Sequence, residues 1–119
     1  MKASEREHIV DQIVNEIYEA YPFLWERFGE NGRKRTKEDN YHHLDHLSTT
    51  YEMGEEQFFM DYTKWLQTVL TSRDVGTELI IDNYERLYRH LEGLEDHDEQ
   101  KAYQSYLKNG IEFLRATNE

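Results

Sequence analysis

The hydrophobic positions of this chain recur with the spacing of α-helices. Residues 4–21 place their apolar side chains on one helical face, at Ile9, Val10, Ile13, Val14, Ile17, Tyr18 and Tyr21. Pro22 ends this helix, because proline lacks a backbone N–H and clashes with the preceding turn. A short aromatic helix follows and ends at Gly29; it contains Phe23, Leu24, Trp25 and Phe28.

A long helix is expected between the turn signal Asn31-Gly32 and Gly54, with Leu44 and Leu47 on its apolar line. Residues 58–70 carry the clearest amphipathic pattern, which predicts that they contribute most to the core. Two more helices are expected over residues 80–91 and 102–114, on either side of an acidic turn. Since no segment alternates with period two, the sequence predicts an all-α protein of about six helices.

The length and composition of the chain indicate how large the domain is and which side chains form its core. A chain of 119 residues fits one helical domain spanning residues 1–119. Only 37% of the residues are hydrophobic and the net charge is −11, but two Trp, nine Tyr and five Phe are incompatible with a disordered chain. We therefore expect a folded core built from few, large side chains.

The charge balance and the residue types exclude several classes of function. With 25 acidic against 14 basic residues, neither nucleic acid nor an anionic membrane is an expected partner. The lack of cysteine excludes disulfides, thiolate nucleophiles and Cys-ligated zinc. No apolar run approaches the roughly 20 residues that span a bilayer, and the polar start favours a cytoplasmic protein.

The middle of the chain resembles a known family. The run KRTKEDNYHHLDHLSTTYEMGEEQFFMDYTKWLQTVLTSRDVG resembles the corresponding segment of phycobiliproteins, the globin-like light-harvesting proteins. Along DYTKWLQTVLTSRDV the chain is also similar to phycobilisome-like proteins of non-photosynthetic bacteria and to helical domains that precede cobalamin-binding regulatory domains. The resemblance covers residues 29–91 and implies a globin-like fold.

The resemblance also implies roles for single residues. Asp39 falls where the family's aspartate binds the pyrrole nitrogens of a linear tetrapyrrole, whereas Thr36 stands in place of the cysteine that attaches the bilin. A covalent bilin is thereby excluded, and a non-covalent tetrapyrrole is the cofactor that the resemblance leaves open. Glu38 replaces the family's propionate-binding arginine, so Arg33, Lys34 or Lys37 would have to meet the acid groups of the ligand.

Other residues allow further interpretations. The four cations at the start of the long helix form either an anion site or a solvated face; they are Arg33, Lys34, Arg35 and Lys37. Asp39, His42 and His46 have the composition of a metal-binding helix face, although exposed or hydrogen-bonded histidines are the simpler interpretation and we expect no metal. His90 is the candidate for a haem ligand. An aromatic set forms either core or the wall of a flat ligand pocket: Tyr62, Trp65, Tyr84, Tyr88, Tyr103 and Tyr106.

The sequence leaves two main functional hypotheses. No serine lies in a G-x-S-x-G context and no glycine-rich loop could cradle phosphate, so we expect no enzyme. The first hypothesis is a regulatory or protein-interaction module that pairs with itself as a homodimer or with a regulatory partner, through Phe23, Trp25 and Phe28. The alternative is a sensor that binds a linear tetrapyrrole or another flat anionic ligand beside Asp39.

Overall fold

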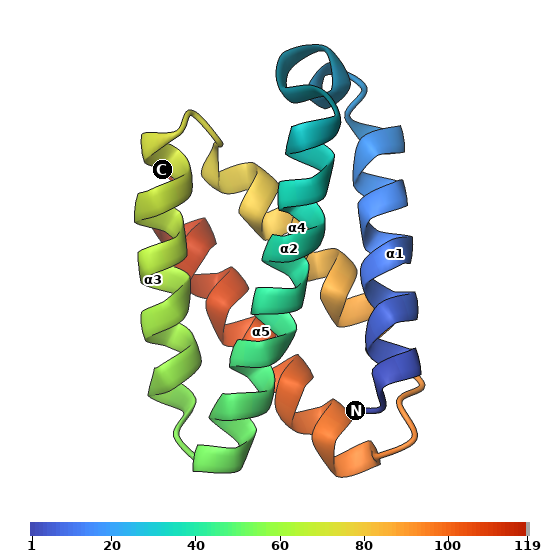
Figure 1. Cartoon of the computed structure of the whole chain (residues 1–119). Helices are drawn as coiled ribbons and strands as arrows, with labels where there is room; N and C mark the ends of the chain where they lie inside the picture. The colour runs from blue at the N-terminus through green and yellow to red at the C-terminus, as the bar shows by residue number, and fades with distance from the viewer. Residues whose placement is uncertain (119) are drawn as a thin grey trace.

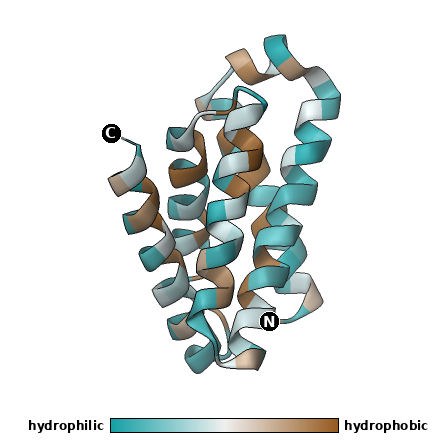
Figure 2. Ribbon diagram, turned by 90° about the vertical axis from the view of Figure 1, so that its left-hand side faces the viewer, coloured by the Kyte–Doolittle hydropathy of each residue, from teal (hydrophilic) through white to brown (hydrophobic). Residues whose placement is uncertain are grey.

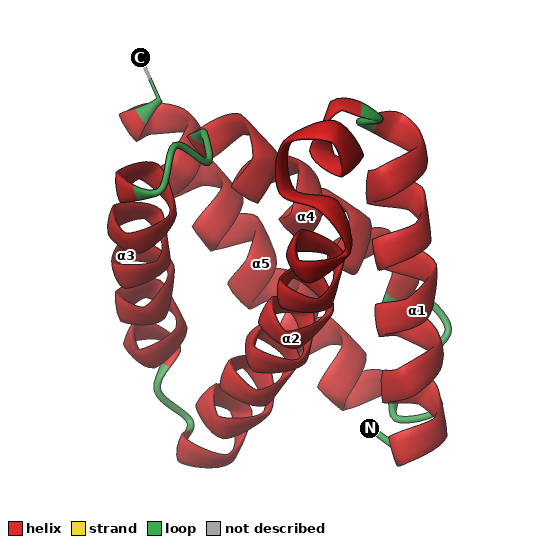
Figure 3. Ribbon diagram, turned by 45° about the horizontal axis from the view of Figure 1, so that its top comes forward, coloured by secondary structure: helices red, strands yellow, loops and turns green. Residues whose placement is uncertain are grey.

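The computed structural model describes residues 1–118, which fold into five α-helices in two layers (Figure 1). In one layer α2 lies between α1 and α3, and in the other α4 and α5 pack against each other and cross behind the first layer. The helices are α1 (Ala3–Ala20), α2 (Phe23–Met53), α3 (Glu56–Ser72), α4 (Thr77–His90) and α5 (His97–Thr117). Within residues 1–118 no strand occurs, which confirms the all-α class (Figure 3).

The short aromatic helix ends at Gly29 as expected, because the backbone of this residue is not helical, but helical geometry resumes directly after it, so the two segments form one kinked element and the count is five in place of about six. α2 begins directly after Pro22 and continues to Met53, with a kink at Gly29. Gly29 has φ 62° and ψ −156°, a backbone conformation that residues with a Cβ rarely adopt. The break expected at Asn31-Gly32 is wrong, since both residues are helical and Phe28 packs where a Cβ on Gly32 would stand.

The other helix ends agree with the sequence pattern. α1 ends at Ala20, two residues before the proline. Gly54 caps α2 in the left-handed conformation, with φ 67°, and its N–H donates to the carbonyl of Thr50 at 2.9 Å. The following helices begin a few residues before the apolar pattern does, because their first turns are polar.

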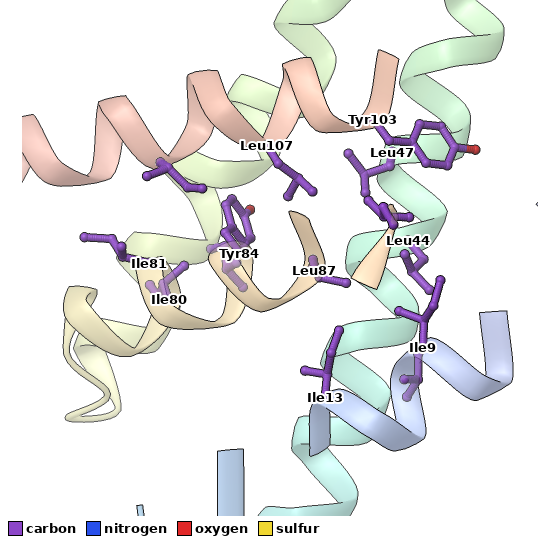
Figure 4. Close-up of a cluster of buried hydrophobic side chains, with 14 of the residues drawn as sticks. Ile9, Ile13, Leu44, Leu47, Ile80, Ile81, Tyr84, Leu87, Tyr103 and Leu107 are labelled. Carbon is purple, nitrogen blue, oxygen red and sulfur yellow. The ribbon is translucent and has the colours of Figure 1, made fainter. Parts of the chain in front are cut away.

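The buried apolar side chains form one cluster to which all five helices contribute. Hydropathy colouring shows the apolar side of each helix turned inward (Figure 2). Figure 4 shows Ile9 and Ile13 of α1 close to Leu44 of α2 at one end of the cluster, and Tyr84 of α4 with Ile80 and Ile81 at the other. The prediction that residues 58–70 contribute most to the buried core is wrong.

Helix α3 buries only a few apolar side chains, although it packs against α2, α4 and α5. Only Phe59, Tyr62 and Leu66 are buried apolar residues of α3, whereas α1 buries an unbroken stripe from Ile9 to Tyr18. Trp65, at the middle of the expected stripe, is 59% exposed. In residues 1–118 no helix is long and apolar enough to cross a membrane.

Truncation of a core leucine should reveal how much the buried cluster stabilises the fold. Leu47 is fully buried, so Leu47→Ala should lower the free energy of unfolding by about 2–5 kcal/mol, measured by urea denaturation. Met53, near the end of the same helix, is 55% exposed, and Met53→Ala should change the free energy of unfolding by less than about 0.5 kcal/mol. Equal losses in the two variants would contradict this description of the core.

Candidate functional site

A pocket of about 150 Å³ opens between α1, α2 and α4, at the end of the molecule where α2 is kinked. No Cα atom of α2 comes within 8 Å of a Cα atom of α4, so side chains alone occupy the space between these helices. Most of the lining is apolar and comes from all sides: Ile17, Leu24, Phe28, Leu70, Val75, Leu79 and Ile80.

Two short segments close the pocket at its outer end. Residues 23–28, here called the aromatic turn, carry Leu24 and Phe28 over the pocket. Opposite them, the α3–α4 connection supplies Arg73 and Val75, and Asp74 between these two has a left-handed backbone with φ 63°. Arg27 of the aromatic turn reaches the Asp74 carboxylate, with 3.8 Å between Nη2 and Oδ2.

Asp39 is the distinctive polar group of this pocket. Its side chain is half-buried, and it makes no hydrogen bond or ion pair with another residue in the described part of the chain. Burial raises the pKa of the Asp39 carboxyl, and the charges of His42, Arg73 and Arg35 offset this only in part. A half-buried carboxylate without a donor in an apolar pocket is a typical feature of a ligand site.

The other charged groups of the lining fall into two kinds. Asp82 is paired with Arg86, with 2.7 Å between Oδ2 and Nε, and Arg86 continues to Glu16 at 3.1 Å. Arg35 and Arg73, by contrast, lie within 4 Å of no carboxylate among residues 1–118. The pocket therefore carries one anionic and two cationic groups that the rest of the described chain leaves unpaired.

At the inner wall of the pocket, polar side chains are buried in matched pairs. Asn40 and Asn83 exchange two amide hydrogen bonds, at 3.0 and 2.7 Å. His43 Nδ1 lies 2.6 Å from the hydroxyl of Tyr62, and burial lowers the pKa of His43 to about 3, so its imidazole is neutral. His43 and Asn83 also line the pocket, and the hydrogen bond to Tyr62 engages only the Nδ1 atom of His43.

The sequence analysis missed Asn40, His43 and Asn83 as interior groups. A usable signal was present, because Asn40, His43 and Leu47 follow one another at helical spacing on the buried face of α2. Polar residue type concealed it, since asparagine and histidine are usually exposed.

The structure divides the ligand residues that the sequence grouped together. Asp39 and Thr36 line the pocket, and the Thr36 hydroxyl donates to the carbonyl of Gly32 at 3.0 Å. Arg33, Lys34 and Lys37 instead line a second hollow between α1 and α2. There Arg33 donates to Asn15 at 2.6 Å, and Lys37 pairs with Asp11 at 3.2 Å. The cations that accompany Asp39 are therefore Arg35 and Arg73.

The three aromatic residues predicted for an interface lie on the aromatic turn. Phe23 and Trp25 are 45% and 44% exposed. Trp25 packs edge-on against Tyr18, with 5.1 Å between ring centroids. Phe28 is 36% exposed and also lines the pocket, so it belongs to both the candidate interface and the candidate site.

The candidate metal and haem ligands have other roles in the structure. In residues 1–118 no group of three or more His, Asp and Glu side chains is arranged to hold a metal ion. His46 donates from Nδ1 to the carbonyl of His42 at 2.8 Å and stacks on Tyr62. His90 lies half-buried, with its Nε2 2.6 Å from Glu16, which is a polar setting and not an apolar haem pocket.

The aromatic set separates into core and surface. Tyr62, Tyr84, Tyr103 and Tyr106 are buried, whereas Trp65 and Tyr88 are exposed, and none of the six lines the pocket beside Asp39. The Tyr84 hydroxyl pairs with Thr63 at 2.9 Å.

Comparison of the chain with models of protein families, with curated proteins and with solved structures finds no match.

Buried His43 should make the protein sensitive to acid. Its folded pKa of about 3 lies below the unfolded value of about 6.5, so between these values the unfolded chain binds more protons and stability falls as pH falls. From pH 7 to pH 5 we expect His43 to remove about 2 kcal/mol of unfolding free energy, a loss that His43→Gln should abolish. Urea denaturation at both pH values measures it.

Exposed His8 offers the matched control for this experiment. His8→Gln should keep the acid sensitivity of the wild type. If His43→Gln loses as much stability as the wild type between pH 7 and pH 5, burial of a neutral His43 is wrong.

Proposed function

We propose that this protein is a non-enzymatic regulatory module that binds a small molecule in the pocket beside Asp39 and signals through the aromatic turn. The observation that carries the proposal is the unpaired, half-buried carboxylate of Asp39 in an otherwise apolar pocket. A carboxylate in this position destabilises the fold unless a donor reaches it, and a ligand with an N–H group would supply that donor.

The aromatic turn connects the pocket to the surface. Phe28 and Leu24 form part of the pocket wall, while Phe23 and Trp25 of the same turn face solvent. Gly29 joins this turn to the rest of α2 through a non-helical residue, which allows the turn to change its angle without unwinding the helix. A ligand that packs against Phe28 would shift the population of turn positions, and a partner protein would respond to that shift.

The pocket supports binding in preference to catalysis. His43 is its one histidine, and it is kept neutral by burial and engaged by Tyr62, so it is poorly suited to proton transfer near pH 7. Asp82 is occupied by Arg86. A regulatory role therefore fits the described groups better than an enzymatic one.

We also propose, from the resemblance to phycobiliproteins, that these helices have a globin-like ancestry. In that case Asp39 keeps the family's role and accepts a hydrogen bond from the ligand. A volume of about 150 Å³ is the size of a cavity that holds benzene, and four linked pyrrole rings are much larger. We therefore propose a small ligand in place of a linear tetrapyrrole, which would fit only if the aromatic turn moved outward.

Replacement of Asp39 should stabilise the protein without ligand. The folded pKa of Asp39 is raised, so its ionisation above pH 4 is more costly in the folded state than in the unfolded chain. Asp39→Asn removes this charge and should raise the Tm at pH 7, measured by calorimetry, while it weakens binding of any ligand that needs the carboxylate. Exposed Glu112 is the control, and Glu112→Gln should leave the Tm nearly unchanged.

A lower Tm for Asp39→Asn would mean that the carboxylate is satisfied within the fold. Asp39 would then not be an unpaired carboxylate, and the proposed ligand site would be contradicted.

The aromatic turn should mediate association with a partner, which we propose to be a second copy of the chain. Wild-type protein should then show a molar mass that rises with concentration in light scattering, and Trp25→Ala should reduce this rise because a large exposed ring is lost from the contact. Trp65 of α3 is even more exposed, and Trp65→Ala should have no effect. A monomer at all concentrations would remove self-association from the proposal.

A further inference from the structure

The unpaired charges of the pocket have a pattern that describes a ligand. Asp39 is anionic, and Arg35 and Arg73 are cationic, and none of the three has an ion-pair partner within residues 1–118. Asp82, the fourth charged group of the lining, is neutralised by Arg86. A ligand that satisfies all three groups must carry a positive charge for Asp39 and a negative charge for the arginines.

The apolar part of the pocket lining limits the size and shape of the uncharged part of the ligand. Aliphatic side chains dominate it, with Ile17, Leu79 and Ile80 among them, and Phe28 closes one side. A volume of about 150 Å³, which holds benzene, accepts a branched aliphatic group of about four carbons, and a compact polar head would then lie at the opening beside the charged groups. It is too small for a nucleotide, a fatty acid or a peptide of several residues.

We propose that the pocket binds a free α-amino acid with a branched aliphatic side chain. The ammonium group donates to Asp39, the carboxylate accepts from Arg73 and Arg35, and the side chain packs among the apolar residues between α1 and α4. This inference rests on the proposed function and names the ligand class of the same site.

A zwitterion fits this pocket better than a molecule with a single charge. An amine alone would satisfy Asp39 but would face two arginines, which repel it. A carboxylic acid alone would meet the arginines and would leave Asp39 beside a second anion. In an α-amino acid the ammonium and carboxylate groups are bonded to the same carbon. One small molecule can therefore pair with Asp39 and with the arginines without adding net charge to the pocket.

The test compares three molecules that share the 3-methylbutyl group of leucine. L-leucine carries both charges, 3-methylbutylamine lacks the carboxylate, and 4-methylpentanoate lacks the ammonium group. Titration calorimetry on the full chain should show saturable binding of L-leucine, and binding of each single-charge analogue should be about tenfold weaker or more, since each loses a charge-assisted contact. L-leucine should also raise the Tm.

Variants show whether the assigned groups make these contacts. Asp39→Asn and Arg73→Gln should each weaken L-leucine binding about tenfold or more. For Asp39→Asn the affinity for 4-methylpentanoate should not fall, because this analogue has no ammonium group to lose. The control is Lys34→Gln in the second hollow, which should bind L-leucine like the wild type. Circular dichroism checks that each variant is folded.

The outcomes separate this inference from the proposed function. Equal binding of L-leucine and 3-methylbutylamine, or of L-leucine to wild type and Arg73→Gln, would overturn the zwitterion. If all three molecules fail to bind, but a fragment library shifts NMR signals of Asp39 and Phe28, the amino-acid inference is wrong and the pocket is still a ligand site. If the library also leaves these signals unchanged, the amino-acid inference and the proposed ligand-binding function are both wrong.

Discussion

The paired amides of Asn40 and Asn83 hold α2 and α4 in register across a space that their backbones do not bridge. Each side chain donates to the other, and Asn40 also donates to the carbonyl of Thr36 at 2.9 Å. Both residues are buried, so a shift of either helix would leave amide groups without partners in the interior. This constraint fixes the separation of the two helices, and the pocket is the part of that separation that side chains do not fill.

On the inner side of the amide pair the space is filled by aromatic and imidazole rings. His43 lies edge-on to both Tyr62 and Tyr84, with 5.7 and 5.6 Å between ring centroids, and the Tyr84 hydroxyl is satisfied by Thr63. On the outer side the filling is incomplete, and the carboxylate of Asp39 lies there without a donor. Among residues 1–118, the buried polar side chains beside the amide pair have hydrogen-bond partners, whereas the carboxylate of Asp39 faces the opening without one.

The kink at Gly29 connects this opening to the most aromatic part of the surface. Without it α2 would continue straight past α1, and Leu24 and Phe28 would not cover the pocket. The same geometry leaves Phe23 and Trp25 exposed, a state that is unfavourable for large rings and is typical of a surface that contacts another molecule. Binding and signalling would therefore depend on one short segment.

Helical periodicity in the sequence was sufficient for the all-α class and for most helix ends, because each apolar stripe and each stop signal at Pro22 and Gly54 is a local feature. It placed the start of the long helix at Asn31-Gly32, whereas both residues are helical and the backbone leaves helical geometry at Gly29. It also overstated the contribution of α3 to the core, because a stripe of apolar residues does not reveal which of them the packing will cover, and Trp65 in this stripe stays exposed.

The candidate site shows the same division. The sequence named Asp39 and Thr36 as candidate ligand residues, and both line the pocket; it also grouped Arg33, Lys34 and Lys37 with Asp39 because they are close along the chain. On a helix, however, residues a few positions apart point to different faces, and these cations face α1 while Asp39 faces α4. Arg73 comes to Asp39 from the α3–α4 connection, and only the packing of distant segments determines such a neighbour. The sequence by itself determined which helices form, whereas the tertiary structure decided which charges meet and which remain unpaired, because charge pairing depends on distances between helices that local periodicity does not encode.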